Sequence, residues 1–193
     1  MGANNGSRVG AAKPKIGGGI WWAPLGTALP TDSTTPLSAA FKCIGPISVA
    51  GVRPDRSVSS EKEREWDGSV LADLLTEENR SFEFDVLGVF DQDALNFIYG
   101  SAQVTVTPAT AVAGTKIAIV DKGGQQPPGV LVLEMQHNGI KQRKAVPIGQ
   151  ATVTSERAYI AGGLRGWTAR VEATKDEAGA FVYEYDELND RAA

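Results

Sequence analysis

The sequence predicts a mainly β protein, an antiparallel β-sandwich or barrel with one short flanking helix and long extended loops. Several short segments alternate apolar and polar residues, and turn residues separate them. A convincing helical stripe occurs only at 91–99. Many short strands with little helix are typical of antiparallel folds. The 193 residues suffice for one domain with a real core.

Composition narrows the functional classes. The net charge of −4 would repel a polyanion such as DNA rather than hold it. A single cysteine, Cys43, excludes an internal disulfide and a cysteine-based zinc cluster, and it fits a reducing cytoplasm. We expect no membrane association, because no apolar run reaches the length of a membrane span and no signal peptide is visible.

The first half of the chain begins with a small, polar segment, 1–18, which we expect to be a flexible arm. A first strand at 20–23 leads into a long ordered loop at 24–40, and short strands follow at 41–44 and 47–52. These strands open a single domain that we place at 19–187, before a C-terminal tail at 188–193.

The most polar segment, 53–80, is expected to be a second long loop. Its alternating charges at 61–65 suit either a solvated strand or a short helix. A stretch this long between core strands is usually functional, so we expect it to contact a partner.

A strand and a helix follow this loop. Residues 82–86 alternate as in a half-buried strand. Asp91 is placed to cap a helix with an apolar stripe, and Gly100 ends that helix. Further strands are expected at 103–107 and 115–120.

A long hairpin is predicted at 129–148. Asn138-Gly139 lies between two runs of β-formers, and a type I′ turn requires positive φ at both central residues. A turn there pairs Gln136 with Lys141, Glu134 with Arg143, Leu131 with Val146, Leu133 with Lys144, and Met135 with Gln142. The base of the hairpin would be buried and its tip mixed. Such a hairpin either reaches another subunit or is an ordinary sandwich hairpin.

The remaining strands are expected at 151–160, 166–174 and 181–185. The segment 166–174 has the clearest alternation of apolar and polar residues.

The sequence offers little to catalysis, so we expect no enzyme, cofactor or metal. His137 lies beside the predicted turn, which is a poor place to hold a base, and Cys43 has no evident base to activate it. A helix N-terminus explains Asp91 and Asp93 without a metal. A ligand platform could use the four tryptophans, although at strand spacing they are more often core or interface residues: Trp21, Trp22, Trp66 and Trp167.

Several motifs in order resemble a known family. They are Gly26-Thr-Ala-Leu-Pro-Thr-Asp32 after the first strand, Glu65-Trp-Asp-Gly68, Phe82-Glu-Phe84 leading to Ala94-Leu-Asn-Phe-Ile-Tyr-Gly100, Gly166-Trp-Thr-Ala-Arg-Val-Glu-Ala173 and Phe181-Val-Tyr-Glu-Tyr185. The set resembles the major tail tube protein of long-tailed bacteriophages, most closely those that infect actinobacteria. It spans most of 19–185. Asp67 departs from the pattern, where a glycine is expected after the tryptophan.

The resemblance implies a structural protein without enzyme activity or cofactor. Six subunits would form a ring, and stacked rings would form a tube whose inner β-barrel lets DNA leave the head without specific binding. Long loops and the N-terminal arm would bridge rings. The implied partners are further copies of the chain, the tape measure protein, and tail terminator and tip proteins. The implied location is the virion tail, assembled in the cytoplasm of the host bacterium.

Two sets of candidate residues follow from this reading. Acidic residues on the polar faces of predicted strands either line the lumen or simply face solvent: Glu83, Asp85, Glu134 and Glu172. Arg143 and Arg170 would partly offset their charge. Contacts between subunits or rings are expected from Trp66, Leu29, Leu74, Asn138 and Lys141. We expect Trp66→Ala to abolish tube formation and to leave the monomer folded.

The strand pattern also suits a different class of protein. A carbohydrate-binding or adhesin β-sandwich on a virion or cell surface would share the strands and the exposed tryptophans, and it would bind a glycan. An enzyme on a β-sandwich would need a convergent catalytic site, and the sequence shows none.

Overall fold

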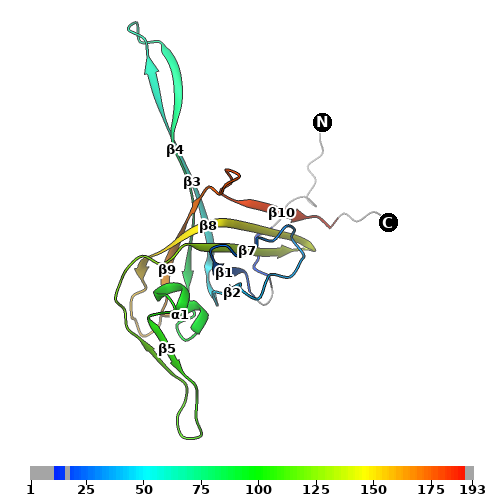
Figure 1. The fold of residues 1–193 in the computed structure, drawn as a ribbon, viewed down its shortest axis with the longest axis vertical. Helices are drawn as coiled ribbons and strands as arrows, with labels where there is room; N and C mark the ends of the chain where they lie inside the picture. Colours follow the sequence, from blue (N-terminus) through cyan, green and yellow to red (C-terminus); the bar gives the residue numbers. More distant parts are fainter. Residues whose placement is uncertain (1–10, 16–17, 190–193) are drawn as a thin grey trace.

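The computed structural model describes residues 11–15 and 18–189 (Figure 1). Within them the chain is mainly antiparallel β with one short helix, as predicted, and its sheets are not closed into a barrel. The main sheet has eight strands in the order β2-β1-β7-β8-β9-β4-β3, with β10 also paired to β8, and β5 and β6 form a separate pair. The bounds are β1 Ile20–Pro24, β2 Lys42–Cys43, β3 Ile47–Arg64, β4 Val70–Val86, α1 Gln92–Tyr99, β5 Val104–Thr107, β6 Lys116–Ile119, β7 Gly129–His137, β8 Ile140–Glu156, β9 Trp167–Thr174 and β10 Tyr183–Glu187.

The centre of the sheet is the hairpin β7–β8. Asn138 and Gly139 have φ of 50° and 80°, as a type I′ turn requires, and all five predicted cross-strand pairs are present. The hairpin does not leave the domain. β1 borders β7, and β10 and β9 border the two halves of β8, so it is a hairpin of the sheet interior.

The main core lies between one face of the sheet and α1. The predicted helix is confirmed, and the Asp91 carboxylate caps it by accepting the backbone N–H of Asp93 at 2.8 Å. Phe97 of α1 stacks on Phe84 of β4 at 6.0 Å between ring centroids. The core residues of this face include Ile20, Phe84, Val86, Leu95, Ile98, Leu131, Val146, Trp167 and Val171.

A smaller core lies on the opposite face of β1, β7 and β8. Residues 25–41 form no strand, and their apolar side chains, including Leu29 and Phe41, cover Val130 and Val132. The middle of the sheet is therefore covered on both faces, by α1 on one side and by this loop on the other.

The segment 53–80, expected as a long loop, is instead most of a hairpin formed by β3 and β4. Its register runs from Arg53 opposite Glu83 to Arg64 opposite Val70. Nearly all side chains of β3 face solvent, so its sequence lacks the alternation of apolar and polar residues that predicts a half-buried strand. The segment is a strand because its backbone pairs with β4.

The outer part of this hairpin projects far from the rest of the fold (Figure 1). β9 pairs with β4 only as far as Arg80, so residues 57–79 form a two-stranded ribbon that we call the arm. The shorter hairpin of β5 and β6 projects at the opposite end of the long axis (Figure 1).

The N-terminal segment 1–18, which we expected to be flexible, falls partly outside the described residues, which omit 1–10 and 16–17. The described part runs along β7. The N–H of Gln136 donates to the carbonyl of Lys13 at 2.7 Å, and the N–H of Lys15 donates to the carbonyl of Glu134 at 3.1 Å. Of the expected tail, 190–193 also lie outside the described residues.

Candidate assembly surfaces

The arm exposes large apolar side chains on both of its faces. Trp66 is 103% exposed, and Leu71, Leu74 and Leu75 are 67%, 55% and 59% exposed. Because successive strand residues point to opposite faces, Leu74 and Leu75 lie on different faces of the ribbon. Two-stranded ribbons are at best marginally stable in water, so an arm of this composition gains from contacts with another molecule.

The arm is also strongly acidic. Residues 57–79 contain seven acidic and two basic side chains, a net charge of −5. This exceeds the charge of −4 on the whole chain, so the remaining residues are close to neutral. An apolar and acidic arm favours a partner surface that is apolar and basic.

The arm ends in a tight turn at Glu65–Ser69. The N–H of Gly68 donates to the carbonyl of Glu65 at 2.8 Å, and Gly68 takes the positive φ of 87°. The Asp67 carboxylate accepts the N–H of Ser69 at 2.8 Å, which lowers the pKa of Asp67. Asp67 therefore fits where the sequence pattern suggested glycine, because the next residue adopts the left-handed conformation.

Three of the four proposed lumen residues share one open face of the sheet. Glu83 and Asp85 alternate along β4 with buried phenylalanines, and Glu172 of β9 lies opposite Ser81. Arg53 pairs with Glu83 at 2.8 Å, and Thr168 donates to Asp85 at 2.9 Å. The Glu172 carboxylate lies 3.5 Å from the Arg170 guanidinium, so an arginine stands beside this carboxylate as well.

The fourth, Glu134, lies on the same side of the sheet but beneath the 25–41 loop. Glu134 is 4% exposed and Arg143 is 1% exposed, and the two form an ion pair. The charge of Glu134 is thus neutralised within the protein and is not presented on the open face.

This buried pair fastens three segments together. The Arg143 guanidinium donates to the carbonyl oxygens of Asp32 at 2.6 Å and Thr35 at 2.9 Å, which holds the 25–41 loop. Lys15 reaches Glu134 from the N-terminal segment at 3.2 Å. The Asp32 carboxylate in turn accepts the hydroxyl and N–H groups of Thr35 and Thr34, which lowers the pKa of Asp32.

The five residues expected at contacts between subunits occupy different environments. Trp66 and Leu74 lie on the exposed arm. Leu29 is half-buried and packs in the smaller core, and Lys141 pairs with Glu187 of β10 at 3.2 Å. Asn138 is exposed at the β7–β8 turn. Only the arm residues combine exposure with a large apolar surface.

The four tryptophans do not form a platform. Trp167 is buried and meets Tyr99 edge-on at 5.7 Å, and Trp22 meets Phe97 in the same way at 5.2 Å. Trp21 is half-buried in the smaller core. Trp66 stands apart at the tip of the arm.

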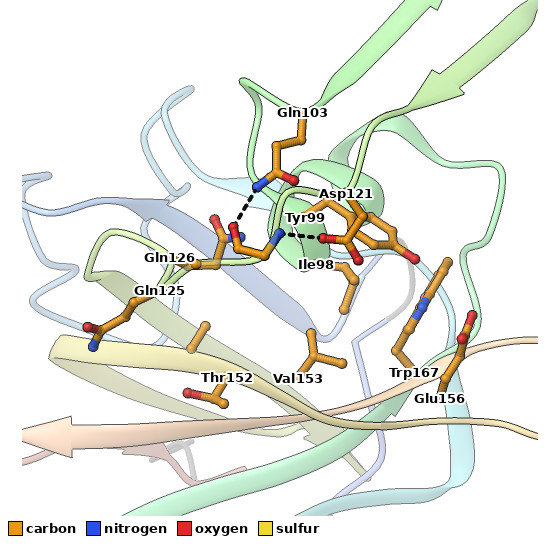
Figure 2. A pocket seen from close by; sticks show the side chains of 13 residues that line it. Ile98, Tyr99, Gln103, Asp121, Gln125, Gln126, Thr152, Val153, Glu156 and Trp167 are labelled. Atoms are coloured by element: carbon orange, nitrogen blue, oxygen red, sulfur yellow. Dashed lines mark hydrogen bonds between the residues drawn. The ribbon is translucent and has the colours of Figure 1, made fainter.

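A pocket of about 420 Å³ lies between α1, the 121–126 loop and the ends of β8 and β9 (Figure 2). Its apolar walls come from Ile98, Val153 and Trp167, and the carboxylates of Asp121 and Glu156 also line it. Burial raises the pKa of the Tyr99 phenol at its edge.

The loop that forms one wall of this pocket is held in place. Gln103 accepts the N–H of Lys122 at 2.7 Å and donates to the carbonyl of Gly123 at 3.3 Å. No local sequence pattern predicts this pocket, because its residues come from five separate segments.

Two further features of the described residues bear on function. None of their acidic, histidine and cysteine side chains gather in threes or more around a point that could hold a metal ion. The helix that they form is too short to cross a membrane.

The described residues form an open antiparallel sheet with a long arm whose apolar side chains are exposed, a surface typical of proteins that pack against other subunits. The chain belongs to the phage tail tube protein family, since the family model described as "Phage tail tube protein" matches residues 1–180. This family assignment confirms the resemblance, and it makes the protein a structural component of the phage tail, which fits a non-enzymatic role. Similarity to tubes of actinobacterial phages stays a prediction. A search of curated proteins found no match.

Proposed function

We propose that the chain is the repeating subunit of the tail tube, in which copies form rings, six subunits to a ring, and the rings stack around a DNA channel. The observation that carries this proposal is the arm. It exposes leucines on both faces and a tryptophan at its tip, and these surfaces are covered once it reaches into a neighbouring ring.

The open face of β3, β4 and β9 is proposed to line the channel. Its carboxylates Glu83, Asp85 and Glu172 would repel the DNA backbone, and the arginines beside them limit the charge that gathers around the channel. DNA would then slide along the channel without binding. In the ring, strands of neighbouring copies would pair and remove the free sheet edges.

The tube would meet other tail proteins at its ends and inside its channel. We propose the tape measure protein as the occupant of the channel before DNA release, and terminator and tip proteins as partners at the two ends. Assembly would take place in the cytoplasm of the host bacterium, before the tail joins the head.

The test is negative-stain electron microscopy of the purified protein over a concentration series. We expect hollow tubes or stacked rings for the native chain. Replacing Leu71, Leu74 and Leu75 together with serine, or Trp66→Ala alone, should abolish the tubes, because both changes remove the apolar surface of the arm.

The matched control keeps the arm and alters an equally exposed apolar residue elsewhere. Val112 lies in the loop between β5 and β6 and is fully exposed, so Val112→Ser should leave tube formation unchanged. Unchanged circular dichroism would show that each variant is folded. Tubes that persist without the arm leucines would contradict the proposed role of the arm, and dispersed particles at every concentration of the native chain would count against the tube itself.

A further inference from the structure

The arm tip and the pocket lie at opposite ends of strand β4. The strand starts at Val70 beside the tip and ends at Val86, which pairs with Trp167 of the pocket wall. Seventeen residues at roughly 3.3 Å each separate the two ends by about 55 Å. The tip of one copy cannot reach its own pocket, but it can reach the pocket of another copy placed end to end.

The loop beside the pocket complements the arm in charge. Residues 157–165 join β8 to β9 and contain two basic side chains, Arg157 and Arg165, and no acidic one. The arm carries a net charge of −5. Opposite charges on two surfaces favour their encounter and fix their orientation.

The same loop is also apolar and exposed. Tyr159, Ile160 and Leu164 all project into solvent, and the Arg165 guanidinium lies 5.0 Å from the centre of the Tyr159 ring. Exposed apolar residues next to arginines match an arm on which exposed leucines lie next to glutamates.

The pocket itself suits an indole. Ile98, Val153 and Trp167 offer apolar walls for the ring, while the carboxylates of Asp121 and Glu156 are acceptors for its N–H (Figure 2). Glu156 is positioned by the hydroxyl of Tyr159, which donates to it. Tryptophan in a fitted pocket is a common anchor of protein interfaces.

We propose that the arm tip of one copy docks on the pocket and the 157–165 loop of a second copy, with the Trp66 indole in the pocket. The inference rests on the proposed function and names the receiving surface for the arm. The contact joins two different surfaces of identical chains, so it repeats from copy to copy and extends a stack.

Cross-linking of assembled protein tests this contact directly. Two cysteine variants are made in a Cys43→Ala background: Ser69→Cys near the tip and Gln125→Cys at the rim of the pocket. Neither change touches Trp66 or the loop arginines. The variants are mixed, assembled and treated with a short bis-maleimide.

The expected product is a dimer that contains one copy of each variant, and the double-cysteine chain should give a ladder of higher multimers. The matched control replaces Gln125→Cys with Val112→Cys, which is exposed on the neighbouring hairpin, and it should give no dimer with Ser69→Cys.

Charge exchange gives a second readout. Arg157→Glu with Arg165→Glu should abolish assembly, and Glu63→Arg with Glu65→Arg on the arm should restore it. Lys116→Glu reverses a charge on β6, outside the pocket lining, and should leave assembly intact.

The failure of this inference differs from the failure of the proposed function. Tubes that form normally but give no Ser69–Gln125 dimer, and that tolerate the loop arginine changes, would overturn the docking surface and leave the tube intact. A native chain that forms no rings or tubes at any concentration would overturn both.

Discussion

The hairpins β7–β8 and β3–β4 are both long and antiparallel, yet their surroundings differ completely. Val130–Leu133 in β7 are apolar in succession, and α1 and the 25–41 loop cover the two faces on which they lie. Leu71, Leu74 and Leu75 in β4 also occupy both faces of a ribbon, but nothing in the described chain covers them. An apolar strand without alternation is one that needs cover on both sides, and under the proposed function other copies of the chain would cover the arm.

The largest expected difference between the hairpins concerns their leucines. Leu131→Ala leaves a cavity in a fully buried site and should lower the free energy of unfolding by about 2–5 kcal/mol. Leu74→Ala removes an exposed side chain and should change the free energy of unfolding of the monomer by less than about 0.5 kcal/mol. Urea unfolding measures both, and an equal loss in the two variants would mean that the arm is packed in the monomer.

The ion pairs across the two hairpins should differ next. Arg143→Met leaves Lys15 as the remaining ion-pair partner of the buried Glu134, and it releases the 25–41 loop. We therefore expect the free energy of unfolding to fall by about 3 kcal/mol. Arg56→Met at the base of the arm breaks an exposed pair with Glu78 and should cost less than about 1 kcal/mol.

A third variant separates the charge from the packing of Arg143. Glu134→Leu combined with Arg143→Met removes both charges and should recover part of the stability, because no unpaired carboxylate remains. If the double variant is no more stable than Arg143→Met, the loss comes from the freed loop rather than from the charge of Glu134.

The same contrast explains what sequence could predict. The turn at Asn138-Gly139 fixed the register of β7–β8, and Asp91 with an apolar stripe fixed α1. The arm was expected as a loop, because solvated strands such as 53–64 carry no apolar period. The burial of Glu134 beneath the 25–41 loop depends on contacts between distant segments, and so does the formation of the pocket. Local sequence patterns do not encode such contacts.

The turns of the two hairpins should respond differently to small changes. Asn138 has a φ of 50°, so Asn138→Ala forces an unfavourable left-handed conformation and should cost about 1 kcal/mol. Asp67→Ala in the arm turn loses a hydrogen bond to Ser69 but leaves the left-handed position on Gly68. It should leave the urea midpoint of the monomer unchanged, and a shift would show that the tip is coupled to the folded sheet.

The smallest expected effect is a pH dependence of the free energy of unfolding, to which the 25–41 loop on the sheet contributes and the arm does not. Hydrogen bonds from Thr35 and Thr34 lower the pKa of Asp32 below its ordinary value of 3.8. The folded chain therefore binds fewer protons there than the unfolded chain. The stabilising contribution of Asp32 is complete above pH 3.8 and is lost as the pH falls below it toward the folded pKa.

Asp32→Asn should therefore lower the urea midpoint at about pH 6, and its difference from the native chain should shrink by about pH 3. Asp67 also has a lowered pKa, but its carboxylate bonds only within the arm turn. Asp67→Asn should leave the midpoint unchanged at both pH values, because the arm contributes little to the cooperative unfolding of the sheet. A midpoint that responds equally to the two substitutions would mean that arm and sheet unfold as one unit, and the contrast between the two hairpins would then hold only for their surfaces.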